Sequence, residues 1–213
     1  MRRTPFQKFK DFLTFPLRAV TLFHEDRFGL SCQATERYDY VASAVIGRAL
    51  DMGCGTNRLV RDFLNGDGVG VDVFKYEENH DGLIFENLLH LPFRDGEFDS
   101  VTFLANFSHI PENEREPVIA EACRVVRPGG NIIVTMALPL VEVLVHQLIW
   151  LYDRLFGTHL DHDNERGMKE GESYYLTERE IRRLLTKAGF EKITYRPFWT
   201  QWGMNGMYIG WKS

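Results

Sequence analysis

The stretch from residue 48 to residue 60 constrains the fold of this chain more than any other. It reads RALDMGCGTNRLV: apolar residues lead up to Asp51, small residues follow, and a pattern that can open a helix comes last. This order predicts a strand, a tight turn and a helix. Gly53 and Gly55 allow a ligand to approach the backbone closely, and the amides of the turn and of the helix N-terminus would face that ligand.

Asp51, at the end of the predicted strand, indicates which kind of ligand the turn suits. A carboxylate is a poor neighbour for a phosphate, and a good one for a cation or for hydroxyl and amine donors. The turn also lacks the third glycine of the G-x-G-x-x-G pattern that is typical of pyrophosphate-binding turns. We therefore expect a nucleoside that carries an amino acid rather than a dinucleotide.

A second acidic residue follows at an informative distance. The short apolar run 69–73 reads as the next strand, and Asp72 lies near its end, with Val73 after it. In nucleoside-binding α/β folds, an acid about 20 residues beyond the glycine turn accepts hydrogen bonds from the ribose hydroxyls. We expect Asp72 and Val73 to contact the ligand of the glycine turn.

The rest of the chain continues the alternation of strands and helices. Leu104 and Ala105 are predicted to lie at the tip of the fourth strand, beside the ligand. A helix that starts at Thr177 carries a capping box, because Glu180 stands three residues after Thr177. The predicted strands are 83–85, 98–104, 131–136, 191–195 and 206–211, and the predicted helices are 36–46, 58–64, 111–126, 138–156 and 176–189.

Three of these stretches together resemble the class I S-adenosylmethionine-dependent methyltransferases, in particular the small-molecule enzymes of type 11. Residues 51–57 (DMGCGTN) are similar to the first motif of that family, although Asn57 stands where a third glycine is usual. Asn tolerates unusual backbone angles, so the turn can be kept. Residues 87–99 and 121–130 are similar to the family's Leu-Pro-Phe stretch and its Pro-Gly-Gly turn.

The resemblance implies a fold, a cofactor and its contacts. The fold is a doubly wound, Rossmann-like α/β sheet of seven strands, mostly parallel, with an antiparallel last strand. The cofactor is S-adenosyl-L-methionine, and Asn87, where the family usually has Asp, and Leu88 would approach its adenine. The implied cofactor-binding residues are Asp51, Gly53, Cys54, Gly55, Asp72, Val73, Asn87, Leu88, Leu104 and Ala105. An NAD(P)-binding oxidoreductase and a non-catalytic S-adenosylmethionine-binding protein remain as alternatives.

We interpret the chain as one methyltransferase domain with two additions to the minimal fold. An N-terminal helical arm precedes the core, and an insertion after the fifth strand forms a lid over the acceptor. The four parts are the arm 1–35, the cofactor-binding core 36–136, the insertion 137–175, and the C-terminal helix and strands 176–213. In the polar loop of the insertion, His159, His162, Glu165 and Arg166 are candidate acceptor contacts. Their spacing fits no strong metal motif, so no metal is expected.

His109, just past the fourth strand, is the candidate catalytic base for methyl transfer to an oxygen atom. A histidine that only packs at the start of the next helix is the alternative. The expected acceptor is a small molecule, a glycan or a lipid-linked compound. The sequence does not predict an oligomeric state.

Composition and the N-terminal segment bear on partners and location. A net charge of -5 makes nucleic acid an improbable partner, and three widely spaced cysteines favour a reducing cytoplasm. Neither a signal peptide nor an apolar stretch long enough for a membrane span is evident. Residues 1–30 are basic and aromatic, with Phe6, Phe9 and Leu13 on one helical face up to Pro16, which we expect to interrupt the helix. Such an arm can pack on the domain as a helix, or it can make peripheral contact with the inner membrane surface or a lipid-linked substrate.

Overall fold

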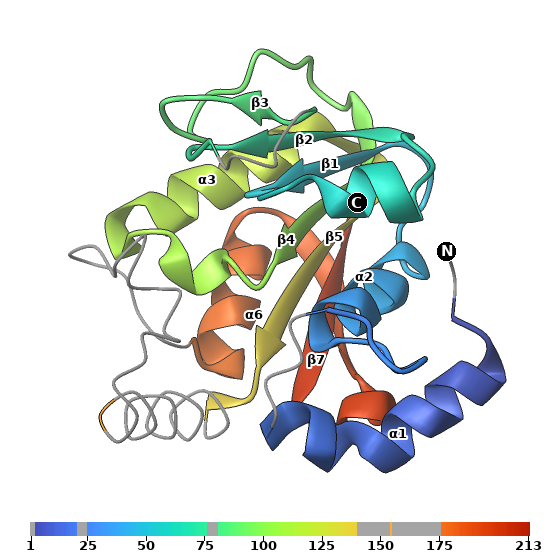
Figure 1. Ribbon diagram of the computed structural model, residues 1–213. Helices are drawn as coiled ribbons and strands as arrows, with labels where there is room; N and C mark the ends of the chain where they lie inside the picture. The colour runs from blue at the N-terminus through green and yellow to red at the C-terminus, as the bar shows by residue number, and fades with distance from the viewer. Residues whose placement is uncertain (1–2, 21–24, 76–80, 140–153, 155–175) are drawn as a thin grey trace.

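The computed structural model describes residues 3–20, 25–75, 81–139, 154 and 176–213 (Figure 1). Its centre is a seven-stranded sheet in the order β3-β2-β1-β4-β5-β7-β6. The strands are β1 (Ala49–Met52), β2 (Gly68–Asp72), β3 (Leu83–Ile84), β4 (Phe98–Leu104), β5 (Val126–Ala137), β6 (Phe190–Pro197) and β7 (Asn205–Lys212). β7 is antiparallel to both of its neighbours, and the pairs from β3 to β5 are parallel. The predicted fold class is confirmed.

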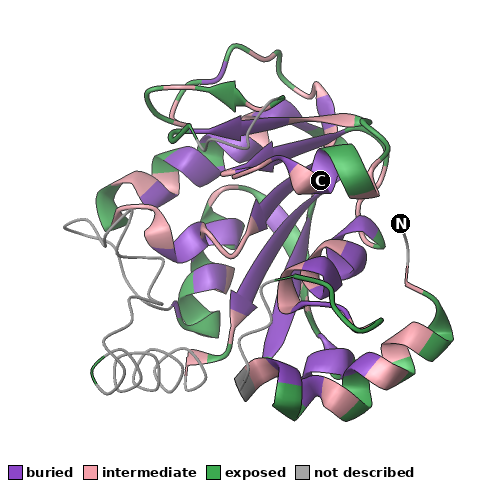
Figure 2. Cartoon of the chain, viewed as in Figure 1, coloured by how far each residue is buried: buried purple, intermediate pink, exposed green. Residues whose placement is uncertain are grey.

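Helical segments cover both faces of the sheet. They are α1 (Pro5–Val20), α2 (Gln33–Ala42), η1 (Leu59–Phe63), η2 (Phe107–His109), α3 (Glu112–Val125), α6 (Glu178–Lys187) and η3 (Trp199–Gln201). β5 shows how the faces are divided: Ile132 and Val134 pack with α3 and α6, whereas Ile133 packs with α2 and η1. Alternate residues of a strand point to opposite faces, so a strand between two layers is apolar throughout. Figure 2 shows the central strands buried along most of their length.

Several predicted boundaries shift in the structure. The helix expected at 36–46 is α2, which starts three residues earlier and ends four residues earlier. The fifth strand begins at Val126 instead of residue 131, because Val126 already pairs with Phe98 of β4. The predicted capping box at the start of α6 is present, with the Thr177 side chain bonded to the Glu180 amide and Glu180 bonded back.

The prediction that Pro16 interrupts the N-terminal helix is wrong, because α1 continues through it to Val20. A proline lacks the N–H that would bond the carbonyl four residues earlier, which here belongs to Phe12. The indole N–H of Trp202 donates to that Phe12 carbonyl instead, at 2.9 Å. A tertiary contact with the end of η3 thus satisfies the acceptor that Pro16 leaves open.

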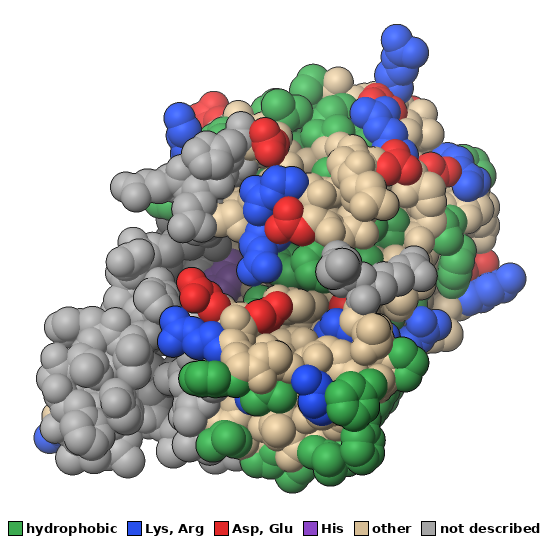
Figure 3. Space-filling model, turned by 45° about the vertical axis from the view of Figure 1, so that its right-hand side comes forward, with side chains coloured by type: hydrophobic (Ala, Val, Ile, Leu, Met, Phe, Trp, Pro, Cys, Tyr) green, Lys and Arg blue, Asp and Glu red, His purple; other side chains and the backbone are tan. Residues whose placement is uncertain are grey.

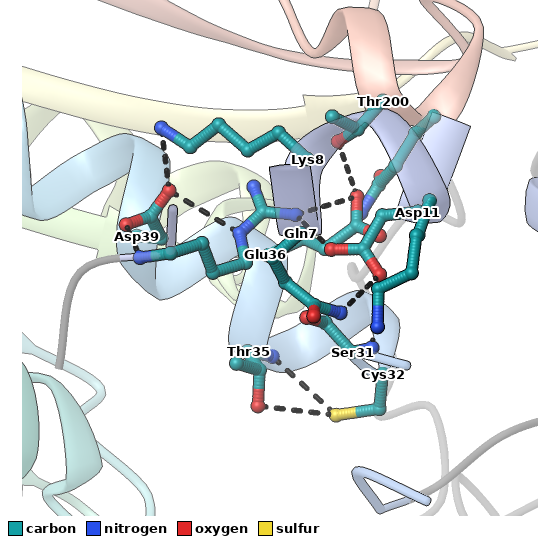
Figure 4. Close-up of polar contacts among 12 residues, drawn as sticks. Gln7, Lys8, Asp11, Ser31, Cys32, Thr35, Glu36, Asp39 and Thr200 are labelled. Carbon is teal, nitrogen blue, oxygen red and sulfur yellow. Dashed lines mark hydrogen bonds and ion pairs between the residues drawn. The ribbon is translucent and has the colours of Figure 1, made fainter. Parts of the chain in front are cut away.

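Buried ion pairs hold α1 against α2 (Figure 4). The Arg18 guanidinium is fully buried, and its Nη1 lies 2.6 Å from Oε1 of Glu36, which is also fully buried. Arg3 pairs with Asp11 at 2.9 Å and with Asp39 at 3.2 Å. Thr200, in η3, donates its hydroxyl proton to Glu36. Burial raises the pKa of Glu36, against the opposing effects of Thr200, Arg18 and Arg3.

We expect Arg18→Ala to lower the free energy of unfolding by about 3–5 kcal/mol, because it leaves Glu36 buried without its closest cation. Chemical denaturation measures this change. Arg27→Ala, which removes an exposed arginine paired with Glu25, is the control and should change stability by less than about 0.5 kcal/mol. Equal effects of the two substitutions would contradict the role of the buried network.

Candidate functional site

A cavity of about 330 Å³ lies at the carboxyl ends of β1, β2 and β4. Ligands of open α/β sheets bind at this edge, where the ends of parallel strands meet. Its lining residues are Met52, Gly53, Asp72, Val73, Glu86, Asn87, Leu88, Phe103, Asn106, His109, Ile110, Pro111, Glu114 and Val118. Six residues that the sequence nominates from four separate segments therefore surround one space: Gly53, Asp72, Val73, Asn87, Leu88 and His109.

The Asp72 carboxylate joins the glycine turn to the end of β2. Its Oδ2 accepts a hydrogen bond from the Gly55 amide at 2.8 Å. Its Oδ1 accepts from the amides of Val73 at 2.8 Å and Phe74 at 3.0 Å. Three backbone donors fix the orientation of this carboxylate while it borders the cavity.

The glycine turn has the backbone geometry that its sequence predicts. Gly53 has a φ of +73°, and a Cβ on it would lie 2.0 Å from Nδ2 of Asn106. Asn57 takes the left-handed region with a φ of +56°, so the turn is kept without the usual third glycine. Gly70 of β2 is a further requirement, since a Cβ there would lie 2.2 Å from Oδ1 of Asn57.

Asp51 lies behind the cavity wall instead of lining it. Its side chain is 1% exposed, and its Oδ1 accepts a hydrogen bond from the Thr102 hydroxyl at 2.6 Å. Burial raises the pKa of Asp51 to about 7, with a further rise from the Asp72 charge and an opposing effect of the Thr102 bond. A cation bound nearby would favour the ionised form of this carboxylate.

Four other predicted cofactor contacts have distinct surroundings. Burial raises the pKa of the Cys54 thiol to about 12, which makes it an unreactive packing group. The Ala105 amide donates to the Thr135 hydroxyl, and Leu104 packs against the core on the α2 side of the sheet. The residues that line the cavity do not include Cys54, Gly55, Leu104 or Ala105. The contact of these four residues with a cofactor therefore stays a prediction.

Asn106 is a site residue that the sequence analysis did not nominate. Its Nδ2 donates to the carbonyls of Met52 and Gly53, and its Oδ1 is buried with no partner in the described part of the chain. A buried acceptor without a donor at the edge of a cavity suits a ligand that brings a donor. The rule that polar residues after a strand end face the ligand could have identified it.

The charge of the cavity lining distinguishes between cofactors. Asp72, Glu86 and Glu114 line it, and among the described residues of the lining there is no lysine or arginine. A sulfonium with an amino-acid ammonium group gains from such acidic surroundings, whereas a pyrophosphate is repelled by them. The residues present therefore fit S-adenosylmethionine better than a dinucleotide.

His109 ends η2 and is half buried on the wall of the cavity. Its amide donates to the Asn106 carbonyl at 3.0 Å, which fixes the backbone of this turn. Phe103, Ile110 and Val118 supply apolar parts of the same lining. A side chain that can take up a proton is thus placed beside apolar surface. The predicted acceptor contacts His159, His162, Glu165 and Arg166 lie outside the described residues.

The strand order, the antiparallel β7 and a cavity at the ends of β1, β2 and β4 define the class I methyltransferase fold. A family model described as a methyltransferase domain matches residues 50–134. Over residues 50–134 the chain therefore matches the methyltransferase family, and S-adenosylmethionine is the cofactor that this match indicates.

Curated relatives are similar over part of their length. The chain is 29% identical over 135 residues to the ubiquinone/menaquinone biosynthesis C-methyltransferase UbiE of Brucella canis, covering 59% of this chain and 48% of the relative. It is 29% identical over 134 residues to the demethylmenaquinone methyltransferase of Bacillus cytotoxicus, covering 60% of this chain and 55% of the relative. The chain thus spans about half the length of these relatives.

Solved structures of other proteins share the fold of this chain. One is a methyltransferase from Thermotoga maritima described as a possible histamine N-methyltransferase, with a TM-score of 0.63 and 18% identity. That alignment covers 96% of this chain and 100% of the other. Another is the PH0226 protein from Pyrococcus horikoshii, with a TM-score of 0.62, 16% identity, and coverage of 85% and 90%. Both likenesses concern the fold alone.

The high pKa of Asp51 predicts a pH-dependent stability. Because the folded state holds this proton up to about pH 7 and the unfolded state releases it near the ordinary value of 3.8, stability falls as the pH rises between them. The melting temperature of the cofactor-free protein should fall between about pH 4 and about pH 7, and Asp51→Asn should flatten that fall. If the melting temperatures of the wild type and of Asp51→Asn change with pH in the same way, the raised pKa of Asp51 is contradicted.

Proposed function

We propose that the chain transfers the methyl group of S-adenosylmethionine to a small molecule with an apolar body and an ionisable hydroxyl group. The observation that carries this proposal is His109 on the wall of the same cavity as Gly53 and Asp72. The apolar side chains of Phe103 and Ile110 next to it suit the body of such an acceptor.

The reaction needs few groups from the protein. S-adenosylmethionine would supply an electrophilic methyl group to the electron pair of the acceptor, and the electron pair of the broken carbon–sulfur bond would stay on sulfur. His109 takes the hydroxyl proton of the acceptor, which increases the electron density available for that attack. Asp72 and the glycine turn hold the cofactor, and the cavity walls align the acceptor with the methyl group.

The acceptor atom is oxygen in the simplest form of this proposal, because deprotonation of a hydroxyl gives the nucleophile directly. Hydroxylated glycans and lipid-linked alcohols fit that form. The curated relatives favour a second form, since their names describe C-methyltransferases of ubiquinone and menaquinone biosynthesis. In that form the same oxyanion directs electron density to a ring carbon, which takes the methyl group and then loses its own proton. Both forms need a base at the position of His109.

We expect S-adenosylhomocysteine to raise the melting temperature of the protein, and NADH to leave it unchanged. Asp72→Ala should remove most of that rise, because it removes both a cavity wall and the acceptor of the Gly55 amide. Asp67→Asn, an exposed acid just before β2, is the matched control and should keep the full rise. Stabilisation by NADH alone would contradict the cofactor assignment.

We expect His109→Ala to slow methyl transfer by about 100- to 10,000-fold while the affinity for S-adenosylhomocysteine stays within about twofold. Transfer of a labelled methyl group to a naphthoquinol and to a catechol measures the rate, and carbon NMR of the product tells oxygen from ring carbon. His90→Ala, an exposed histidine away from the cavity lining, is the matched control. An unchanged rate in His109→Ala would assign that residue to packing, and bound cofactor with no transfer to any acceptor would favour a binding protein.

A further inference from the structure

The outer face of α1 is a stripe of large apolar side chains in contact with solvent. Phe6, Phe9, Leu13 and Leu17 are spaced by three, four and four residues, so they share one side of the helix. Their side chains are 71%, 54%, 59% and 60% exposed. A contiguous apolar surface of this kind is typical of an interaction site, whereas single exposed apolar residues are common on any protein.

The helix cannot turn this stripe inward. Its opposite side carries Asp11 and Arg18, which are fully buried in the ion-pair network with α2. The carbonyl of Phe12 is also held by the indole of Trp202. Rotation of α1 would expose these charges and break their bonds, so the apolar stripe is fixed toward solvent.

Further aromatic side chains extend the stripe on both sides. Phe28 is 90% exposed at the tip of a tight turn, and the adjacent Gly29 carbonyl accepts hydrogen bonds from Gln7 and Lys10 of α1, both at 2.8 Å. On the other flank, Trp199 and Trp202 are 47% and 51% exposed. We call these residues together with the four of the stripe the α1 face. Figure 3 shows hydrophobic side chains gathered along the lower edge of the molecule, where Figure 1 places α1.

The segment that carries the α1 face is positively charged in an otherwise acidic protein. Residues 1–30 contain six lysines and arginines against three acids, although the net charge of the whole chain is -5. Three of these cations pair with acids of α2: Arg3 and Lys8 pair with Asp39, and Arg18 pairs with Glu36. Arg27 pairs with Glu25. Lys10 lies over the ring of Phe6 at 5.5 Å, so a cation accompanies the apolar stripe.

We propose that the α1 face docks on the surface of an anionic lipid bilayer. Phe, Trp and Leu side chains beside Lys and Arg are typical of helices that lie in the membrane interface. Anionic headgroups complement the charge of Lys10 beside the stripe, whereas a second copy of the chain would bring the Lys10 side chains of two stripes together. Within the described ranges no helix is long and apolar enough to cross a membrane.

The position of the α1 face gives this docking a consequence. α1 packs on η3, which directly follows β6. β6 runs parallel to β5 because both are antiparallel to β7, so η3 lies at the same edge of the sheet as the cofactor cavity. Docking would bring that edge toward the bilayer, where apolar acceptors dissolve. This consequence rests on the proposed function, but the docking itself does not.

Co-sedimentation of the full chain with vesicles tests the proposal. The vesicles contain phosphatidylcholine alone or with phosphatidylglycerol, at low and at physiological salt, without cofactor or acceptor. The double variant Phe9→Glu/Leu13→Glu replaces two exposed side chains, and its melting temperature verifies that it is folded. Leu83→Glu is the matched control, because Leu83 is 45% exposed on β3, at the opposite end of the sheet from α1 (Figure 1).

We expect the wild type and Leu83→Glu to bind the phosphatidylglycerol vesicles equally, more tightly than phosphatidylcholine alone and more weakly as salt rises. The double variant should lose at least about tenfold in affinity. No binding by the wild type, or equal binding by the double variant, overturns the proposal. A third result would also overturn it: the wild type is a dimer by sedimentation velocity, the double variant is a monomer, and neither binds vesicles. A second copy of the chain would then cover the α1 face. The experiment measures no methyl transfer, so its outcome does not depend on whether the proposed function is correct.

Discussion

The arrangement of the site depends on the carboxylate of Asp72. It receives backbone hydrogen bonds from Gly55 in the turn after β1 and from Val73 and Phe74 after β2. The Val71 carbonyl of β2 adds two further bonds to the turn, from the amides of Gly53 and Cys54. Gly70 makes the close approach possible, since any Cβ there would collide with the turn.

Around this tie the cavity combines acids with apolar walls, and the part of its lining that the structure describes contains no lysine or arginine. The Asp72 carboxylate also affects Asp51, because burial and the nearby Asp72 charge together raise the pKa of Asp51. A bound cation would offset that rise, because it favours the ionised form of Asp51. The electrostatics of the site thus agree with the family in favouring a sulfonium cofactor.

Two kinds of surface on α1 explain why its role is hard to see in the sequence. Arginines and acids in the first 40 residues suggest a solvated helix, yet Arg18 and Glu36 are fully buried against each other. The phenylalanines suggest a core, yet Phe6 and Phe9 are exposed. The ion pairs need partners from α2 and Thr200, and those partners lie far along the chain.

The sequence by itself determined the strand–turn–helix at 48–60, the acid at position 72 and the capping box at Thr177, because each depends on residues that are neighbours or lie within one βαβ unit. It also nominated Asn87 and His109 for the edge where strands end. Only the tertiary structure decided three further features. Asn106 donates a hydrogen bond to the Gly53 carbonyl, and the Trp202 indole donates to the Phe12 carbonyl that Pro16 leaves without its helical donor. The third feature is which face of α1 is exposed to solvent. Those outcomes depend on contacts between segments distant in sequence, which local patterns do not encode.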